Sequence, residues 1–145
     1  MAHTDLDELL NTLLPFAQQM LEKNGEFFPF GADMKPAGEI EMIGAYEGHE
    51  HPPSQTLINL MTEAFQKQAL NGELRAAGIC YDVRTIPPGE TEKCDAICMS
   101  LEHQSGEAVD VFVPYKKAWH GKIRYGEIFA SCRSPQFMNK GKNAA

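Results

Sequence analysis

The sequence predicts an α+β protein, with two helices packed on one face of an antiparallel sheet of five or six strands. Two segments, 4–25 and 54–71, repeat apolar residues at helical spacing, whereas much of 74–132 alternates with a period of two. Short turns, such as Pro87–Glu90 and Gln104–Gly106, separate the alternating segments. Because short turns join antiparallel neighbours, we expect these strands to pair in chain order.

The first helix is expected from Thr4 to Gly25. Its apolar stripe comprises Leu6, Leu9, Leu10, Leu13, Ala17, Met20 and Leu21. Pro15 removes the backbone hydrogen bond to Asn11, so it predicts a kink. Gly25 is a typical stop. The second helix is expected from Ser54 to Asn71, with Leu57, Leu60, Met61, Ala64 and Phe65 on its apolar face.

The strands follow from alternation and from the residues that interrupt it. Between the helices we expect a short extended segment at 26–31 and a strand at 39–46. After the second helix we expect strands at 73–86, 92–103, 107–115 and 122–132, which form a C-terminal four-strand meander.

Alternation sorts these strands into a bulky and a small set. The bulky set is Ile79, Tyr81, Val83, Ile97, Met99, Leu101, Val109, Val111 and Val113; the small set is Ala76, Gly78, Cys80, Cys94, Ala96, Cys98 and Ser100. Small side chains permit close helix approach, so both helices are expected on the small face. The bulky face then needs cover, which predicts a homodimer. The alternative is a sheet that curls around its own bulky side chains.

Length and composition indicate one soluble globular domain over 1–145, with a mobile tail at 136–145. No apolar run approaches the ~20 residues of a membrane span. The acidic start argues against export, so we expect a cytoplasmic setting with four reduced cysteines.

The net charge of −7 is unevenly distributed. Residues 1–114 hold 19 acidic and 6 basic side chains, whereas residues 115–145 hold 7 Lys or Arg and one acid, Glu127. The acidic majority disfavours nucleic-acid binding. The basic segment is interpreted as lying beside acidic strands of its own fold, with charge-complementary association as the alternative.

No motif predicts a metal or a cofactor. His49 and His51 lie on one side of an extended segment, but no third ligand stands at a diagnostic spacing. Cys94 and Cys98 would lie ~13 Å apart on a strand, which is too far for a disulfide, so we interpret them as buried, inert thiols.

Two groups of polar residues are candidate sites. Three carboxylates, those of Asp82, Glu102 and Asp110, approach across strands and suggest acid–base chemistry, or else polar strand ends. The predicted binding residues lie in the only stretch that combines a tryptophan with several cations: Tyr115, Lys116, Lys117, Trp119, His120 and Arg124. Aromatic and basic residues recur at binding surfaces, although Trp119 folding back onto the sheet edge is the alternative.

Several short motifs carry a resemblance. The motifs at 27–31 (FFPFG), 38–40 (GEI), 81–83 (YDV), 101–103 (LEH) and 113–115 (VPY) resemble a pattern in small uncharacterised bacterial proteins. The resemblance covers residues 27–126 and implies a bacterial cytoplasmic setting. It implies no activity and no site residue.

Three functional hypotheses follow. The leading one is a non-enzymatic protein-interaction domain, immunity-like or chaperone-like by analogy, that forms a homodimer or binds another protein. The second is a small-molecule sensor with a pocket lined by Cys80, Cys98 and Tyr81. The third is a small hydrolase that uses the carboxylates.

Overall fold

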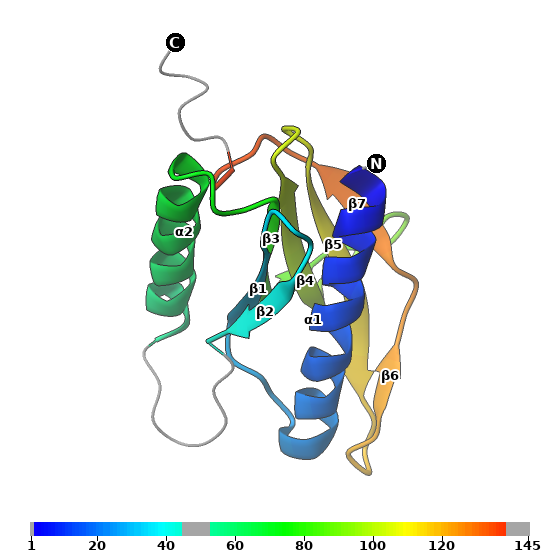
Figure 1. Cartoon of the computed structure of the whole chain (residues 1–145). Coiled ribbons are helices and arrows are strands. Elements are labelled where there is room, and N and C mark those ends of the chain that lie inside the picture. The colour runs from blue at the N-terminus through cyan, green and yellow to red at the C-terminus, as the bar shows by residue number, and fades with distance from the viewer. Residues whose placement is uncertain (1, 45–52, 139–145) are drawn as a thin grey trace.

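The computed structural model describes residues 2–44 and 53–138 and has the predicted α+β class (Figure 1). Its elements are α1 (Ala2–Asn24), β1 (Phe30–Met34), β2 (Ile40–Ile43), α2 (Ser54–Leu70), β3 (Ala76–Thr85), β4 (Cys94–His103), β5 (Ala108–Lys117), β6 (Ile123–Tyr125) and β7 (Phe129–Cys132). The predicted helices and the long meander strands are therefore confirmed to within a few residues.

The strands form one open antiparallel sheet in the order β2-β1-β3-β4-β5-β6, with β7 paired to β5 beside β6. The C-terminal meander is confirmed, but the strand predicted at 122–132 is divided into two. Tyr115 pairs with Tyr125, whereas Phe112 pairs with Phe129, so one extra residue lies between the paired segments. The described part of the sheet therefore has seven strands rather than five or six.

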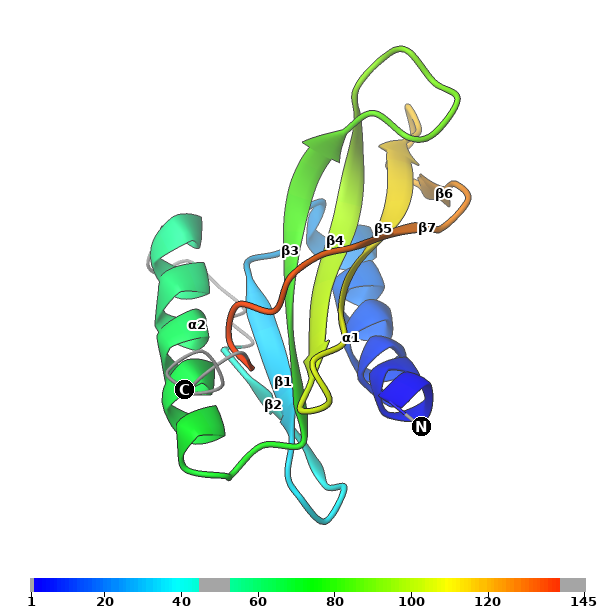
Figure 2. The ribbon, with the colours of Figure 1, turned by 90° about the horizontal axis from the view of Figure 1, so that it is seen from above.

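The two helices lie on opposite faces of the sheet, which corrects the prediction that both cover one face (Figure 2). The reason is strand register. Cys80 pairs with Met99, and Met99 pairs with Val111, so the small residues of β3 share a face with the bulky residues of β4 and β5. That mixed face receives α1. The opposite face, which carries Ala77 and Ile79, receives α2.

The helix positions also remove the reason for expecting a homodimer. The bulky side chains of β4 and β5 pack beneath α1, where all except the half-buried Val109 are buried, and they form no uncovered face. The homodimer stays a prediction that sedimentation equilibrium tests, without the area argument that motivated it.

The first helix runs unbroken through Pro15, whose ring is exposed to solvent. Its buried stripe agrees with the predicted one and packs on β3 and β4. Leu13 approaches the sheet at Gly78, where an added Cβ would come within 3.0 Å of the leucine Cδ1. Glycine is therefore needed for this helix to pack closely.

The segment after β7, residues 133–138, is here called the strap. It crosses the α2 side of the sheet and ends against α2, where Phe137 and Met138 are buried (Figure 2). The Phe137 ring lies 5.4 Å from that of Phe65, and Gln66 donates a hydrogen bond to the Gln136 carbonyl. The prediction of a mobile tail is therefore wrong for 136–138. Residues 139–145 lie outside the described residues.

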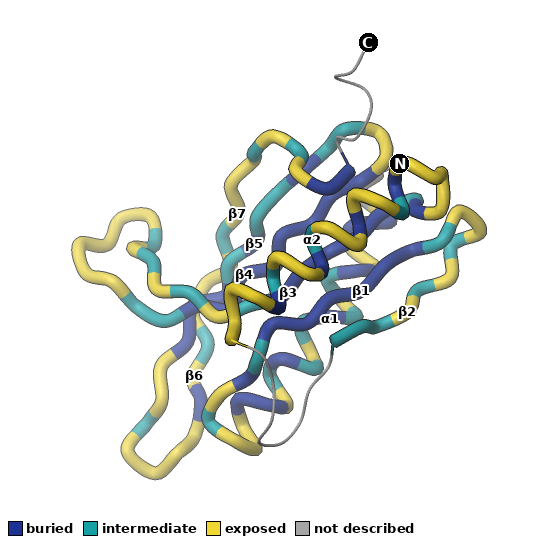
Figure 3. Tube along the Cα trace, turned by 90° about the vertical axis from the view of Figure 1, so that its left-hand side faces the viewer, coloured by how far each residue is buried: buried dark blue, intermediate teal, exposed yellow. Residues whose placement is uncertain are grey.

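The exposed segments include the β3–β4 loop, the β5–β6 connection and the outer surface of α2 (Figure 3). In the two described ranges, neither helix has the length and apolar character needed to cross a bilayer.

Candidate functional site

The predicted binding residues lie on the hairpin formed by β5 and β6, here called the basic hairpin (residues 115–125). Trp119 and His120 form its tip, with ring centroids 5.0 Å apart in an edge-on arrangement. The Trp119 side chain is 94% exposed, so it does not fold back onto the sheet edge. The alternative interpretation of this tryptophan is therefore wrong.

The remaining predicted residues divide between the two faces of the hairpin. Tyr115 lies on the α1 face, is buried, and donates a hydrogen bond of 2.8 Å from its hydroxyl to Asp82. Burial and that bond raise the pKa of Tyr115. Lys117 lies close to Gly25, beside the C-terminal end of α1, where a cation is favoured. These two residues stabilise the fold.

Lys116 and Arg124 lie on the other face, directly opposite each other in the β5–β6 ladder. Both side chains are exposed, and within the part of the chain that the structure describes neither has an ion pair. Like charges directly opposite each other destabilise an antiparallel pair. An anionic group placed between them would relieve this repulsion.

A cleft of about 430 Å³, here called the proline cleft, adjoins this pair of cations. Its apolar lining comprises Pro87, Pro88, Pro114, Ile128 and Phe129. Lys116 lines both the cleft and a neighbouring hollow that Arg124 also lines. The cleft is assembled from the β3–β4 loop and the segment between β6 and β7, so its existence depends on the split of the last predicted strand.

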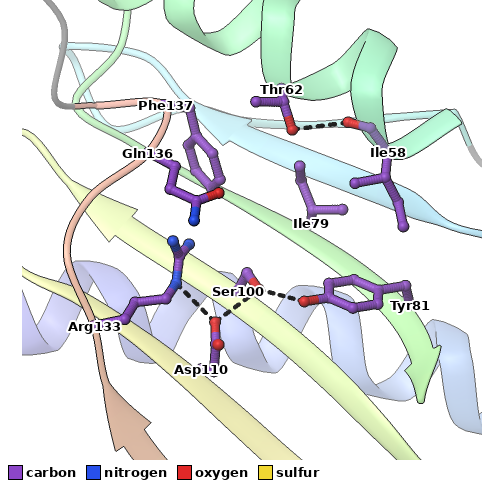
Figure 4. Close-up of a pocket in the computed structure, with 9 residues that line it drawn as sticks. All are labelled: Ile58, Thr62, Ile79, Tyr81, Ser100, Asp110, Arg133, Gln136 and Phe137. Atoms are coloured by element: carbon purple, nitrogen blue, oxygen red, sulfur yellow. Dashed lines mark hydrogen bonds and ion pairs between the residues drawn. The ribbon is translucent and has the colours of Figure 1, made fainter. Parts of the chain in front are cut away.

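A second, smaller pocket of about 110 Å³ lies between α2, the sheet and the strap (Figure 4). The hydroxyls of Tyr81 and Ser100 share a hydrogen bond of 3.0 Å, and Ser100 donates to Asp110 at 2.7 Å. Arg133 donates from Nε to Asp110 at 2.8 Å and lies 2.6 Å from Glu102 through Nη2. This network connects three strands to the strap.

Glu102 is fully buried and its carboxylate is occupied. It accepts main-chain hydrogen bonds from Gln136 at 2.8 Å, from Phe137 at 2.9 Å and from Met138 at 2.8 Å, in addition to the Arg133 pair. A buried charge with this many partners is satisfied. Glu102 therefore holds the strap in place and is not available to a substrate.

The three predicted carboxylates do not form one site. Asp110 shares a network with Glu102, but Asp82 lies on the α1 face, where it accepts the Tyr115 bond. The predicted sensor pocket is divided in the same way. Cys80 is buried under α1, whereas Cys98 and Tyr81 face the α2 side. Burial raises the pKa of the Cys98 thiol to about 11, so it is unreactive.

One buried cluster was not predicted. Arg75 donates two hydrogen bonds of 2.8 Å to Asp5, and Nε2 of His103 lies 2.8 Å from the same carboxylate. The Ser105 amide donates to His103 Nδ1 at 3.0 Å, so both ring nitrogens of His103 have hydrogen-bond partners. The hydrogen bonds from Arg75 have the largest effect on the pKa of Asp5 and lower it. Burial raises this pKa, the bond with His103 lowers it, and the net result lies below the ordinary value.

This cluster anchors the start of α1 to the sheet and leaves no free imidazole nitrogen for catalysis. Its members are 70 and 98 positions apart, so no local sequence signal marks it.

The predicted His49 and His51 pair lies outside the described residues. In the ranges 2–44 and 53–138, no group of three or more His, Cys, Asp or Glu side chains is placed to hold a metal ion. No protein-family model, no curated protein and no solved structure gives a significant match to this chain. Function is therefore inferred from the site itself.

Proposed function

We propose that this chain is a non-enzymatic interaction domain that binds an acidic surface of another protein through the basic hairpin. The observation that carries the proposal is the position of Trp119, which is 94% exposed at the tip of a hairpin. On the two strands of the same hairpin, Lys116 and Arg124 lie directly opposite each other without an acidic partner in the described residues.

Both features have a cost that a partner would offset. An exposed indole leaves a large apolar surface in water, and tryptophan and arginine are enriched among residues that dominate binding energy. Residues 115–125 contain three lysines and one arginine but no acid, in a chain whose net charge is −7. This local reversal favours encounter with acidic surfaces.

The other hypotheses lack such support. Glu102 is saturated by main-chain donors and Asp82 lies on the opposite face, so the carboxylates do not converge on a substrate position. The proposal includes a cytoplasmic setting, which the free state of all four cysteines supports.

The experiment uses Trp119 as the reporter, because it is the only tryptophan. We expect a short poly-glutamate peptide to change its fluorescence saturably and a poly-lysine peptide to leave it unchanged. Added salt should weaken the binding. Lys116→Glu should abolish the response, whereas Lys67→Glu, the same charge change on the exposed side of α2, should not. Equal responses from the two variants would contradict the proposal.

A further inference from the structure

The proline cleft extends the surface that carries the two opposed cations. Lys116 lines the cleft, and three of its other lining residues, Cys94, Pro114 and Gly126, also line the hollow beside Arg124. A ligand bound at the cations would therefore meet the cleft without crossing a ridge of other residues. The two features form one continuous surface, with the paired cations at one end and a cleft lined by both apolar and charged side chains at the other.

Packing contacts and a backbone hydrogen bond hold the walls of the cleft. Phe129 stacks on Phe112 across the β5–β7 ladder, with ring centroids 4.9 Å apart and planes 12° from parallel. Gly126 donates its amide to the Pro114 carbonyl at 2.7 Å, and an added Cβ there would lie 3.2 Å from the proline ring. Proline walls also have little conformational freedom to lose. A preorganised cleft loses less entropy on binding.

The size and lining of the cleft suit an apolar side chain rather than a second carboxylate. A volume of about 430 Å³ holds one large side chain and lies within the range of small-ligand sites. The side chain of Ile128 is 51% exposed at the wall and would be covered by such a group. The acids Glu90, Glu92 and Glu127 also line the cleft, with Lys93 among them, and would repel a carboxylate that entered it.

From these observations we infer the chemistry of the segment that this surface binds. It is an extended acidic peptide segment with a large apolar side chain next to its carboxylates. The carboxylates lie at Lys116 and Arg124, Trp119 covers the segment from the tip, and the apolar side chain enters the proline cleft. The inference rests on the proposed function and adds a sequence requirement to it.

The test compares two synthetic peptides. Each is made twice, once with its residues in the forward order and once in the reversed order, because the direction of the bound segment is not specified. One carries glutamates and a phenylalanine separated by a short glycine spacer, and the other has serine in place of the phenylalanine. Binding is measured by Trp119 fluorescence. We expect the phenylalanine peptide to bind wild-type protein about tenfold more tightly in one direction, as expected for burial of one aromatic ring.

Two variants distinguish the contribution of the cleft to binding from that of the cations. Ile128→Ser should reduce the preference for phenylalanine to about twofold or less, while leaving the serine peptide's affinity unchanged. Its matched control is Leu60→Ser on α2, where the leucine is 54% exposed, and this change should leave the preference intact. Lys116→Glu should weaken both peptides together.

The outcomes distinguish this inference from the proposed function. Equal affinity for the two peptides, with a loss in Lys116→Glu, overturns the inference and leaves the proposed function standing. Failure of both peptides, together with poly-glutamate, overturns both. A Trp119 response to anionic phospholipid vesicles but to none of the peptides would assign the hairpin to a membrane surface and also overturns both.

Discussion

Glu102→Gln tests whether one buried carboxylate holds the C-terminal strap against the sheet. The substitution preserves the size and shape of the side chain but removes its charge and replaces one acceptor oxygen with a donor. The wild-type carboxylate accepts three main-chain hydrogen bonds of 2.8–2.9 Å and pairs with Arg133. Glutamine keeps one carbonyl oxygen, so at least one buried amide or the guanidinium loses its partner.

The expected loss follows from these contacts. A hydrogen bond to a charged group contributes about 1.5–3 kcal/mol, and breaking a buried ion pair from one side costs about 3–5 kcal/mol. The side chain of Glu102 has no exposed surface, so water cannot compensate without opening the strap. We therefore expect the free energy of unfolding to fall by about 3–5 kcal/mol.

Urea denaturation followed by circular dichroism measures this loss, and amide hydrogen exchange locates it. The amides of Phe137 and Met138 should exchange faster in the variant, while those of central β4 should change only with global stability. Asp95→Asn is the matched control, since Asp95 forms an ion pair of 3.1 Å with Arg84 and both side chains are exposed. This substitution should change the free energy of unfolding by no more than about 0.5 kcal/mol. A loss in Glu102→Gln below about 1 kcal/mol, with strap protection unchanged, would refute the role assigned to Glu102.

Three further predictions concern the core and the buried acid. Phe65→Ala should lower the free energy of unfolding by about 3–5 kcal/mol in urea melts, because Phe65 is fully buried between the sheet and Phe137; a loss below about 1 kcal/mol would show that α2 does not bury this face. Gly31→Ala should lower it by about 1–3 kcal/mol, because the new Cβ would lie 2.7 Å from the Gly78 carbonyl, and an unchanged melt would mean that β1 and β3 separate easily. Folding lowers the pKa of Asp5 from 3.8, so the ionised carboxylate stabilises the fold above that pH, and this stabilisation is lost as the pH falls through the folded-state pKa. The free energy of unfolding, measured against pH, should therefore fall more steeply in acid for wild type than for Asp5→Asn. Parallel curves would contradict this.

The type and order of the main elements were determined by the sequence, because both depend on local pattern. The stripe on α1 and the alternation along β3, β4 and β5 set which residues are apolar at which spacing. The basic hairpin was also visible locally, since its cations and its tryptophan are neighbours in the chain. The exposure of these side chains was not visible in the sequence, because whether Trp119 packs against the sheet edge depends on which other segments lie there.

The tertiary structure alone decided which side chains share a face. The β3–β4 connection spans eight residues, 86–93, and a connection of this length does not fix register. A shift of one residue exchanges the faces of a strand, and with them the helix that each face receives. The proline cleft and the strap network have the same origin: their residues come from segments that are distant in the chain, and only strand pairing and packing bring them together.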